Sequence, residues 1–265
     1  MMPTHALYGT LPPGLLEIPA GALPCSPLQP GAIALETLAE ASLTRATLYA
    51  PPGTLERRYS LALALRALAV GGTLTALAPK DKGGSRIAAE LEHFGCTVTD
   101  TSRSHHRIVT TTRPEILQQV DEALTAGAQQ IHPAHGLWTQ PGIFSWDRVD
   151  AGTNLLLAHL PPLAGSGADL GCGLGILSRA VLASPTVTAL TLVDVDRRAV
   201  EAATRNIADA RASCIWADVR HAPLPTALDF VVMNPPFHDA GAEDTSLGLA
   251  FVARAADALK HGGVC

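Results

Sequence analysis

The segment at residues 168–175, with the sequence ADLGCGLG, constrains the fold of this chain more than any other stretch. It joins an apolar run at 167–170, which we expect to be a short strand, to an apolar run at 176–183, which we expect to be a helix. Glycines let the backbone adopt positive φ and pass close to a ligand, and the first N–H groups of the following helix are free to bind polar atoms. The segment therefore favours a strand–turn–helix unit that binds a nucleotide-like ligand.

Two acids follow at the ends of the next expected strands, Asp194 after 189–193 and Asp218 after 212–217. A doubly wound sheet places an acid at the end of its second strand, where it accepts both hydroxyls of a bound ribose. We therefore expect Asp194 to bind ribose; the alternative is an N-cap for the helix from Arg197, a role that Asp196 fits better. Asp218 is expected to meet an adenine amino group, with an ordinary turn aspartate as the alternative.

The most specific signal is Asn234-Pro235-Pro236-Phe237, directly after the apolar run 230–233. Two prolines cannot continue a strand ladder, so they form a rigid turn where a substrate would lie. The Asn234 amide and a neighbouring backbone carbonyl can hold both hydrogens of a planar exocyclic amine, and Phe237 can stack a flipped base. The alternative is a plain Asn-Pro-Pro turn followed by a core phenylalanine.

The rest of the chain alternates strand-like and helix-like runs, which predicts an α/β protein with a mostly parallel sheet in each half. Expected strands in the first half lie at 47–50, 73–78, 96–99 and 107–111, and expected helices at 55–70, 87–94 and 115–126. In the second half, a further strand is expected at 229–233 and helices at 154–160, 197–210 and 246–259. The first thirty residues, rich in Pro and Gly, are expected to form loops with one edge strand, and 127–142 is the expected linker. A helix that ends in Gly-Gly occurs at both 67–72 and 258–263, which indicates two halves built on one plan.

These motifs resemble those of class I S-adenosylmethionine-dependent methyltransferases that act on amino nitrogens, through segments 169–175 and 234–237 and through Asp194. With GIFS at 142–145, DAGT at 150–153 and His238, the chain is similar to the ribosomal RNA guanine-N2 methyltransferases that have two methyltransferase-like domains, the RsmC/RlmG type. The motif match spans residues 142–263. The first half matches only in pattern, through Gly71-Gly72 and the loop at 79–84.

The resemblance implies two Rossmann-like methyltransferase domains in tandem. A degenerate domain at 1–130 would support folding and hold RNA, and the catalytic domain at 131–265 would bind S-adenosylmethionine. The family's catalytic sheet has the order 3-2-1-4-5-7-6, and this chain stops two residues after Gly263. We therefore expect the last strands to be missing and the strand at 230–233 to be an uncovered edge. On this interpretation the chain alone is poorly soluble or less active than a longer one.

The resemblance also implies roles for individual residues. The catalytic residues would be Asn234, Pro235, Pro236 and Phe237, and the cofactor would contact Phe144, Thr153, Asp169, Gly171, Gly173, Gly175, Asp194 and Asp218. The implied reaction is direct methyl transfer from the cofactor's sulfonium to the exocyclic N2 of a guanine in ribosomal RNA, with 16S rRNA favoured. Asn234 and the Pro235 carbonyl would draw the nitrogen lone pair out of conjugation, and no metal is needed. The expected partner is ribosomal RNA or a ribosomal subunit, and the expected enzyme is a cytoplasmic monomer.

Three other functions agree with part of the pattern. A nicotinamide-linked dehydrogenase needs GxGxxG, but Ile176 or Ser178 stands at the third glycine position, and the proline pair has no role there. A catalytically silent RNA-binding or assembly protein is the second alternative. The third is a methyltransferase acting on a protein glutamine or on DNA adenine, since those enzymes share Asn-Pro-Pro-aromatic; Phe237 with Phe144 and Ser145 favours RNA guanine.

Composition narrows the partners further. The net charge of −5 argues against broad electrostatic affinity for nucleic acid, so RNA contacts must come from local patches such as Lys80, Lys82 and Arg86, or 105–107. No apolar run is long enough to span a membrane, and the five cysteines form no CxxC, which indicates reduced thiols and no zinc site. His132 and His135 have metal-like spacing, but they lie in a Pro-broken linker without a third ligand.

Overall fold

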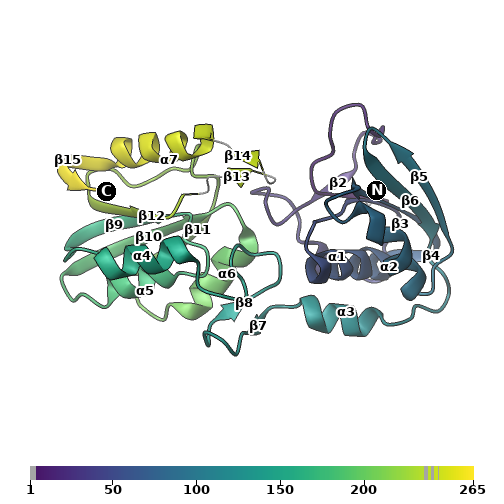
Figure 1. Cartoon of the computed structure of the whole chain (residues 1–265), viewed down its shortest axis with the longest axis horizontal. Coiled ribbons are helices and arrows are strands. Elements are labelled where there is room, and N and C mark those ends of the chain that lie inside the picture. Colours follow the sequence, from purple (N-terminus) through teal and green to yellow (C-terminus); the bar gives the residue numbers. More distant parts are fainter. Residues whose placement is uncertain (1–3, 236–237, 240–241, 244) are drawn as a thin grey trace. The chain divides into compact units, whose positions relative to one another are not determined.

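The computed structural model describes residues 4–235, 238–239, 242–243 and 245–265 (Figure 1). It divides into two compact units, Met1–Ala128 and Gln129–Cys265. Each unit has its own sheet and its own apolar core, so each is described by itself.

The first unit is built on a six-stranded sheet of order β2-β1-β3-β4-β6-β5. Its strands are β1 (His5–Tyr8), β2 (Leu23–Cys25), β3 (Leu43–Tyr49), β4 (Leu68–Pro79), β5 (Val98–Arg103) and β6 (His106–Thr112). The first four strands are parallel, whereas β6 runs antiparallel to both β4 and β5. The expected mostly parallel sheet is therefore correct for four strands.

Helices cover one face of this sheet. They are α1 (Thr54–Ala67), α2 (Ile87–His93) and α3 (Val120–Gly127), with short 3-10 turns at Leu35–Thr37 and Gly84–Arg86. Leu61, Leu65 and Leu91 of these helices are fully buried against the sheet. On the other face, Leu77 and Ile108 pack against Leu15 of the loop between β1 and β2. Burial of this apolar surface is the main force that stabilises such a domain.

Three expectations for the first unit are wrong in detail. The first thirty residues contain two strands, and β1 lies inside the sheet between β2 and β3. The helix expected from 115 begins at Val120, because Gln119 adopts φ +54 and the Gln118 N–H donates to the Phe94 carbonyl. The Gly71-Gly72 pair lies inside β4 and does not end α1, which already ends at Ala67.

The second unit contains a five-stranded parallel sheet of order β11-β10-β9-β12-β15. Its strands are β9 (Gly165–Leu170), β10 (Val187–Asp194), β11 (Ala212–Trp216), β12 (Leu228–Met233) and β15 (Leu259–Val264). This is the 3-2-1-4-5 part of the expected order. Two small hairpins add β7 (Gln130–Ile131) with β8 (Trp138–Thr139), and β13 (His238–Asp239) with β14 (Ala242–Glu243).

Helices pack on both faces of this sheet (Figure 1). The helices are α4 (Ala151–His159), α5 (Ile176–Leu182), α6 (Arg197–Asn206) and α7 (Thr245–Ala258). Val181 of α5 and Ala203 of α6 pack with Leu190 and Phe230 on one face, whereas Phe251 and Ala255 of α7 pack with Ala168 and Val231 on the other. The unit is thus a three-layer α/β domain, as expected for a Rossmann-like fold.

The strand β12 is not the uncovered edge that we expected. It pairs with β9 on one side and with β15 on the other, through Leu228↔Leu259 and Phe230↔Val264. Gly262 adopts φ +78 inside β15, and the pairing register shifts between Leu228 and Phe230. This local irregularity lets the chain pair with β12 immediately after α7 ends, so even the few residues after the helix form a fifth strand.

The two units repeat one arrangement. In each, a strand runs into a proline pair, a helix follows, and the next parallel strand contains Gly-Gly: β3–α1–β4 in the first unit and β12–α7–β15 in the second. The residue before the prolines is Asn234 in the second unit but Ala50 in the first, where it is buried at 2% exposure. The first unit therefore keeps the backbone plan without the amide.

Candidate active site

The glycine turn after β9 is built from three glycines with different roles. All three have positive φ: Gly171 at +75°, Gly173 at +52° and Gly175 at +78°. A Cβ on Gly175 would lie 2.7 Å from Ile207 Cδ1, so this glycine allows α5 to begin close to the end of α6. A Cβ on Gly173 would meet nothing within 4 Å, so the backbone there borders open space. Gly173 is thus the glycine at which the turn faces open space.

Asp194 lies at the end of β10 and holds this turn in place. Its Oδ2 accepts a hydrogen bond from the Gly173 N–H at 2.8 Å, and its Oδ1 accepts one from the Asp196 N–H at 2.8 Å. Burial raises the pKa of Asp194 to about 6, although these backbone hydrogen bonds oppose the shift. The N-cap of α6 is Asp196, whose side chain accepts from the Arg198 N–H and pairs with the Arg198 guanidinium. Asp194 is therefore not needed as a cap.

Asp169 lies directly beneath the turn and is fully buried at 0% exposure. Its Oδ2 accepts a hydrogen bond from Ser178 Oγ at 2.6 Å, whereas its Oδ1 is buried without a hydrogen-bond partner among the described residues. Burial raises the pKa of Asp169 to about 7, and the nearby Asp194 charge adds to the shift, while the Ser178 hydroxyl opposes it. A buried carboxylate oxygen without a donor is costly, which favours the protonated form of this side chain.

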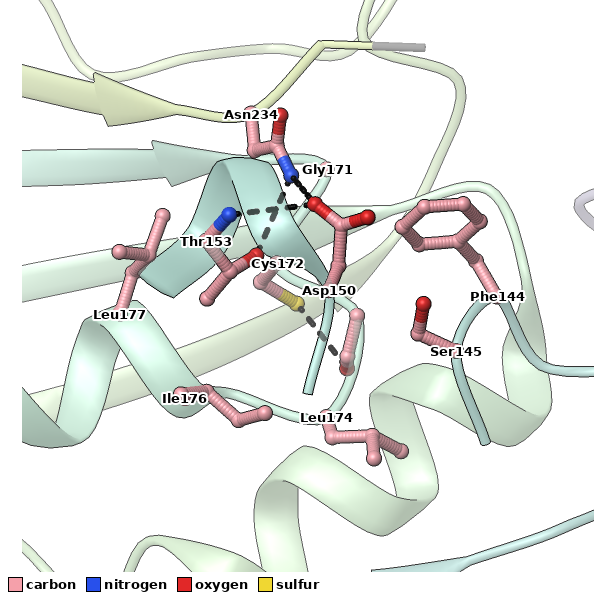
Figure 2. A pocket seen from close by; sticks show the side chains of 11 residues that line it. Phe144, Ser145, Asp150, Thr153, Gly171, Cys172, Leu174, Ile176, Leu177 and Asn234 are labelled. Atoms are coloured by element: carbon pink, nitrogen blue, oxygen red, sulfur yellow. Dashed lines mark hydrogen bonds between the residues drawn. The ribbon is translucent and has the colours of Figure 1, made fainter. Parts of the chain in front are cut away.

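A pocket that opens to solvent lies beside the turn (Figure 2). Phe144 and Ser145 line it from the segment before α4, Asp150 and Thr153 from the start of α4, and Asn234 from the end of β12. The remaining lining residues belong to the turn and to α5: Gly171, Cys172, Gly173, Leu174, Ile176 and Leu177. Segments that are far apart in the sequence therefore meet at the carboxyl edge of the sheet, where such folds bind ligands.

Asn234 is held in this pocket by α4. Its Nδ2 donates to Asp150 Oδ2 at 2.9 Å and to Thr153 Oγ1 at 3.1 Å (Figure 2). Asp150 is also the N-cap of α4, since the same Oδ2 accepts from the Thr153 N–H at 3.1 Å. Burial raises the pKa of Asp150, but the hydrogen bonds from Thr153, Asn234, Gly152 and Ala151 outweigh it, so the pKa lies below its usual value.

Asp150 is a residue of this site to which the sequence reasoning assigned no role. An aspartate three residues before a threonine, at the start of a helix, is a recognisable capping pattern. The contact with Asn234 has no local signal, because it joins residues 84 positions apart.

The structure brings five of the expected site residues together in one pocket. Phe144, Thr153, Gly171, Gly173 and Asn234 line one pocket, and Asp194 is bonded to its glycine turn. Within the described ranges, Asp169, Gly175, Asp194 and Asp218 do not line this pocket. Pro236 and Phe237 lie outside the described residues, and Pro235 follows Asn234 directly. The individual roles remain predictions.

Asp218 binds a neighbouring side chain instead. Its carboxylate accepts hydrogen bonds from three nitrogens of Arg220: the backbone N–H at 2.9 Å, Nε at 3.0 Å and a terminal guanidinium nitrogen at 2.6 Å. This side chain lowers the pKa of Asp218, because the guanidinium stabilises the charged form. An adenine amino group would have to share this carboxylate with Arg220.

The two histidines with metal-like spacing, His132 and His135, contact each other, and His135 also contacts Trp146. The rings of His132 and His135 stack at 5.0 Å between centroids, and His135 Nε2 lies 3.1 Å from the Trp146 carbonyl oxygen. Across the part of the chain that the structure describes, no group of three His, Cys, Asp or Glu side chains is placed to hold a metal. The described helices include none with the length and apolarity required to cross a bilayer.

Residues 134–265 match the family described as Methyltransferase small domain. Ribosomal RNA small subunit methyltransferase C of Shewanella baltica is 35% identical over 124 residues, which are 46% of this chain and 36% of that protein. The protein of the same name from Shewanella pealeana is also 35% identical over 124 residues, with the same coverage. The chain thus matches 36% of the length of these curated relatives.

A solved structure gives a match over both units. The T. thermophilus 16S rRNA N2 G1207 methyltransferase (RsmC), in complex with AdoMet and guanosine, has a TM-score of 0.71 and 26% sequence identity. The match covers 86% of this chain and 65% of that one. The expected family resemblance and the expected α/β fold with two Rossmann-like units in tandem are confirmed.

Proposed function

We propose that this chain, whose residues 134–265 match the methyltransferase small domain family, transfers a methyl group from S-adenosylmethionine to the exocyclic N2 of a guanine in ribosomal RNA. The observation that carries the proposal is that Asn234, from the strand β12, lines the same pocket as the glycine turn after β9. An amide suited to an amine substrate and a turn suited to a nucleotide-like cofactor are therefore adjacent.

The residues around the turn fit S-adenosylmethionine. Asp194 is the acid at the end of the second strand, and each carboxylate oxygen has a second lone pair for a ribose hydroxyl beyond its backbone hydrogen bond. Asp169 belongs to the same proposal as the buried acid just before the turn, where it supports the cofactor site without lining the pocket. A side chain at position 173 would enter the open space beside the turn, so the glycine leaves that space free for the cofactor.

The bound cofactor would supply a methyl group that is already activated on a sulfonium, so the protein's main task is to position the acceptor. An exocyclic guanine nitrogen is a poor nucleophile, because its lone pair is delocalised into the ring. Asn234 Oδ1 and the Pro235 carbonyl would each accept one N–H of this amine. These two hydrogen bonds hold the nitrogen in the geometry of attack, and they favour the transition state over the planar ground state. As the N–C bond forms and the sulfonium C–S bond breaks, the nitrogen would release one of its protons to water.

Two comparisons support guanine in 16S rRNA as the substrate. The Shewanella proteins are named ribosomal RNA small subunit methyltransferases, and the similar solved structure is described as a 16S rRNA N2 methyltransferase with guanosine bound. A nicotinamide-linked dehydrogenase has no such support. Action on RNA of the ribosome also implies a cytoplasmic enzyme, and we propose that it acts as a monomer on the RNA or on a ribosomal subunit.

The first unit has a different proposed role. We infer that residues 1–130 support folding and hold RNA, whereas residues 131–265 bind the cofactor and catalyse the reaction. Ala50 replaces the amide of Asn234 in the first unit, which removes the group that would hold an amine there. Lys80, Lys82 and Arg86 are exposed around the turn after β4, where they can contact phosphates.

The direct test is identification of the product. The 265-residue chain is incubated with S-adenosylmethionine carrying a deuterated methyl group and with either naked 16S rRNA or small ribosomal subunits. The RNA is then digested to nucleosides for mass spectrometry. Labelled N2-methylguanosine is the expected product. Label on adenine or on a ribosomal protein, or no label despite cofactor binding, would contradict the proposal and favour one of the alternatives.

A further inference from the structure

We propose that Asp150 is a positioning residue that fixes the orientation of the Asn234 side-chain amide and so turns the Asn234 carbonyl oxygen towards the substrate amine. This inference rests on the proposed methyl transfer. It assigns to Asp150 a role in the reaction beyond its place as the N-cap of α4.

The hydrogen-bond partners of the Asn234 amide determine which of its two polar atoms is left for a substrate. Asn234 Nδ2 carries two, and the structure gives it two acceptors, Asp150 Oδ2 at 2.9 Å and Thr153 Oγ1 at 3.1 Å. Figure 2 shows both contacts reaching the amide from the start of α4. Asn234 Oδ1 accepts no hydrogen bond from the described residues. The oxygen is therefore the polar atom of this amide that is left for a substrate.

One of the two partners, Asp150, decides the orientation of the Asn234 amide. The two ends of an amide have nearly the same shape, so only the hydrogen-bond partners distinguish them. The Thr153 hydroxyl can donate or accept and therefore tolerates either end. An ionised carboxylate only accepts, so a flipped Asn234 would bring two acceptor oxygens into contact. Of the two described partners of this amide, only Asp150 excludes the flipped orientation.

Asp150 is itself held in place by a hydrogen bond at the start of α4. Its Oδ2 also accepts from the Thr153 N–H at 3.1 Å, which fixes the carboxylate to the first turn of α4. The local hydrogen bonds lower the pKa of this carboxyl group, so it is ionised at neutral pH. A Cβ on Gly152 would lie 3.0 Å from Asp150 Oδ2 and 3.1 Å from Asn234 Oδ1, so the glycine allows the close approach of the helix start to the amide. Cap, carboxylate and amide form one rigid unit.

A flipped Asn234 amide would impair catalysis but not binding of the cofactor. If the amide flips, Nδ2 faces the substrate amine, and two donors oppose each other. The amine is then no longer held for attack, although the glycine turn and Asp194 are unchanged. The role of Asp150 thus predicts a loss in the rate of methyl transfer with little change in cofactor affinity.

The test uses Asp150→Ser in the 265-residue chain. Serine is a good N-cap and keeps an acceptor for the Thr153 N–H, but its shorter side chain does not reach Asn234. We expect the single-turnover rate of methyl transfer to fall about 10–100-fold, because small errors in position cost this much. The dissociation constant of S-adenosylmethionine should change by less than about threefold. Asp150→Asn should recover part of the rate, because its amide oxygen can accept both hydrogen bonds.

Two comparisons separate positioning from a structural effect. Asp147→Ser is the matched control, because Asp147 belongs to the same segment and, among the described residues, pairs with the neighbouring Arg148; its rate should equal that of the unmutated chain. In the Asn234→Ala background, Asp150→Ser should cost nothing further, because no amide remains to be oriented. An equal further loss in that background, or a loss explained by weaker cofactor binding, would overturn the proposal. An unchanged rate in Asp150→Ser alone would also overturn it.

The result remains decisive if the proposed function fails. Should the unmutated chain transfer no methyl group to RNA, the side-chain amide signals of Asn234 in a ¹H–¹⁵N spectrum report whether its Nδ2 hydrogens are bonded to Asp150. These signals are assigned by their absence in Asn234→Ala. They should move in Asp150→Ser and stay in place in Asp147→Ser. Signals that do not respond to Asp150→Ser would overturn the positioning role by themselves.

Discussion

The carboxylate of Asp194 accepts a hydrogen bond from the backbone N–H of Gly173 over 2.8 Å and so joins the end of β10 to the turn after β9. The same carboxylate accepts from the Asp196 N–H, so its position is set before any ligand arrives. A preorganised acid of this kind loses little freedom on binding, which favours affinity. We therefore expect the Asp194 carboxylate to contribute to cofactor binding.

Asp194→Ala should weaken binding of S-adenosylmethionine by about 1–3 kcal/mol, because the ribose hydroxyls lose a charged acceptor and the turn loses a hydrogen bond. Calorimetric titration measures the change. Asp257→Ala is the control, since Asp257 is 73% exposed and its nearest cation, on Arg254, is 4.0 Å away. Equal affinity in the Asp194 variant and in the control would remove Asp194 from the cofactor site.

Asp169→Asn should make the protein more stable at pH 8. The pKa of this buried acid is raised from 3.8 to about 7, so the folded state holds a proton that the unfolded state has lost between these values. Its contribution to stability is therefore full below pH 3.8 and is lost as the pH rises through 7. Three units correspond to roughly 4 kcal/mol in the free energy of unfolding, as an order of magnitude.

Urea denaturation of both proteins at pH 5 and pH 8 measures this effect. The variant should gain most at pH 8, where the carboxylate of the unmutated chain is charged and only Oδ2 has a partner. The gain should be much smaller at pH 5. A gain that is equal at the two pH values would show that the buried charge is not the cause.

Gly173→Ala should reduce cofactor affinity by about 1–3 kcal/mol, because a methyl group enters space that the ligand would occupy. The positive φ of +52° should also cost about 1 kcal/mol in folding stability. Gly136→Ala provides a matched control: its φ is +67°, its Cβ would meet nothing within 4 Å, and it lies in the hairpin between β7 and β8. Both variants should lose similar stability in denaturation, but only Gly173→Ala should lose affinity. Unchanged affinity would place the cofactor elsewhere.

The second unit was largely predictable because its signals are local. The run from β9 through the glycine turn to α5 combines an apolar strand, glycines at positive φ and an apolar helix, and all of these features agree. The acid at the end of β10 and the proline pair after β12 are also read from position in the sequence. Similar local agreement placed α1 and α2 to within a few residues.

Features that depend on contacts between distant residues were not predictable in the same way. The start of α3 is delayed because the Gln118 N–H donates to the Phe94 carbonyl of a different segment. The Gly-Gly pairs predict helix ends, but they lie at irregular points within β4 and β15, which only strand pairing reveals. Asp150 has a local role as a cap, and its contact with Asn234 depends on the fold that brings α4 to the end of β12.

The central claim is that Asn234 holds the amine that receives the methyl group, and Asn234→Ala tests it most directly. The rate of N2-methylguanosine formation in 16S rRNA and the affinity for S-adenosylmethionine are measured for this variant and for the unmutated chain. The account predicts that the rate falls by about 100-fold or more, because an oriented acceptor in the transition state is lost, while the cofactor affinity changes by less than about threefold. Methylation of guanine N2 at the unmutated rate in Asn234→Ala would contradict the account.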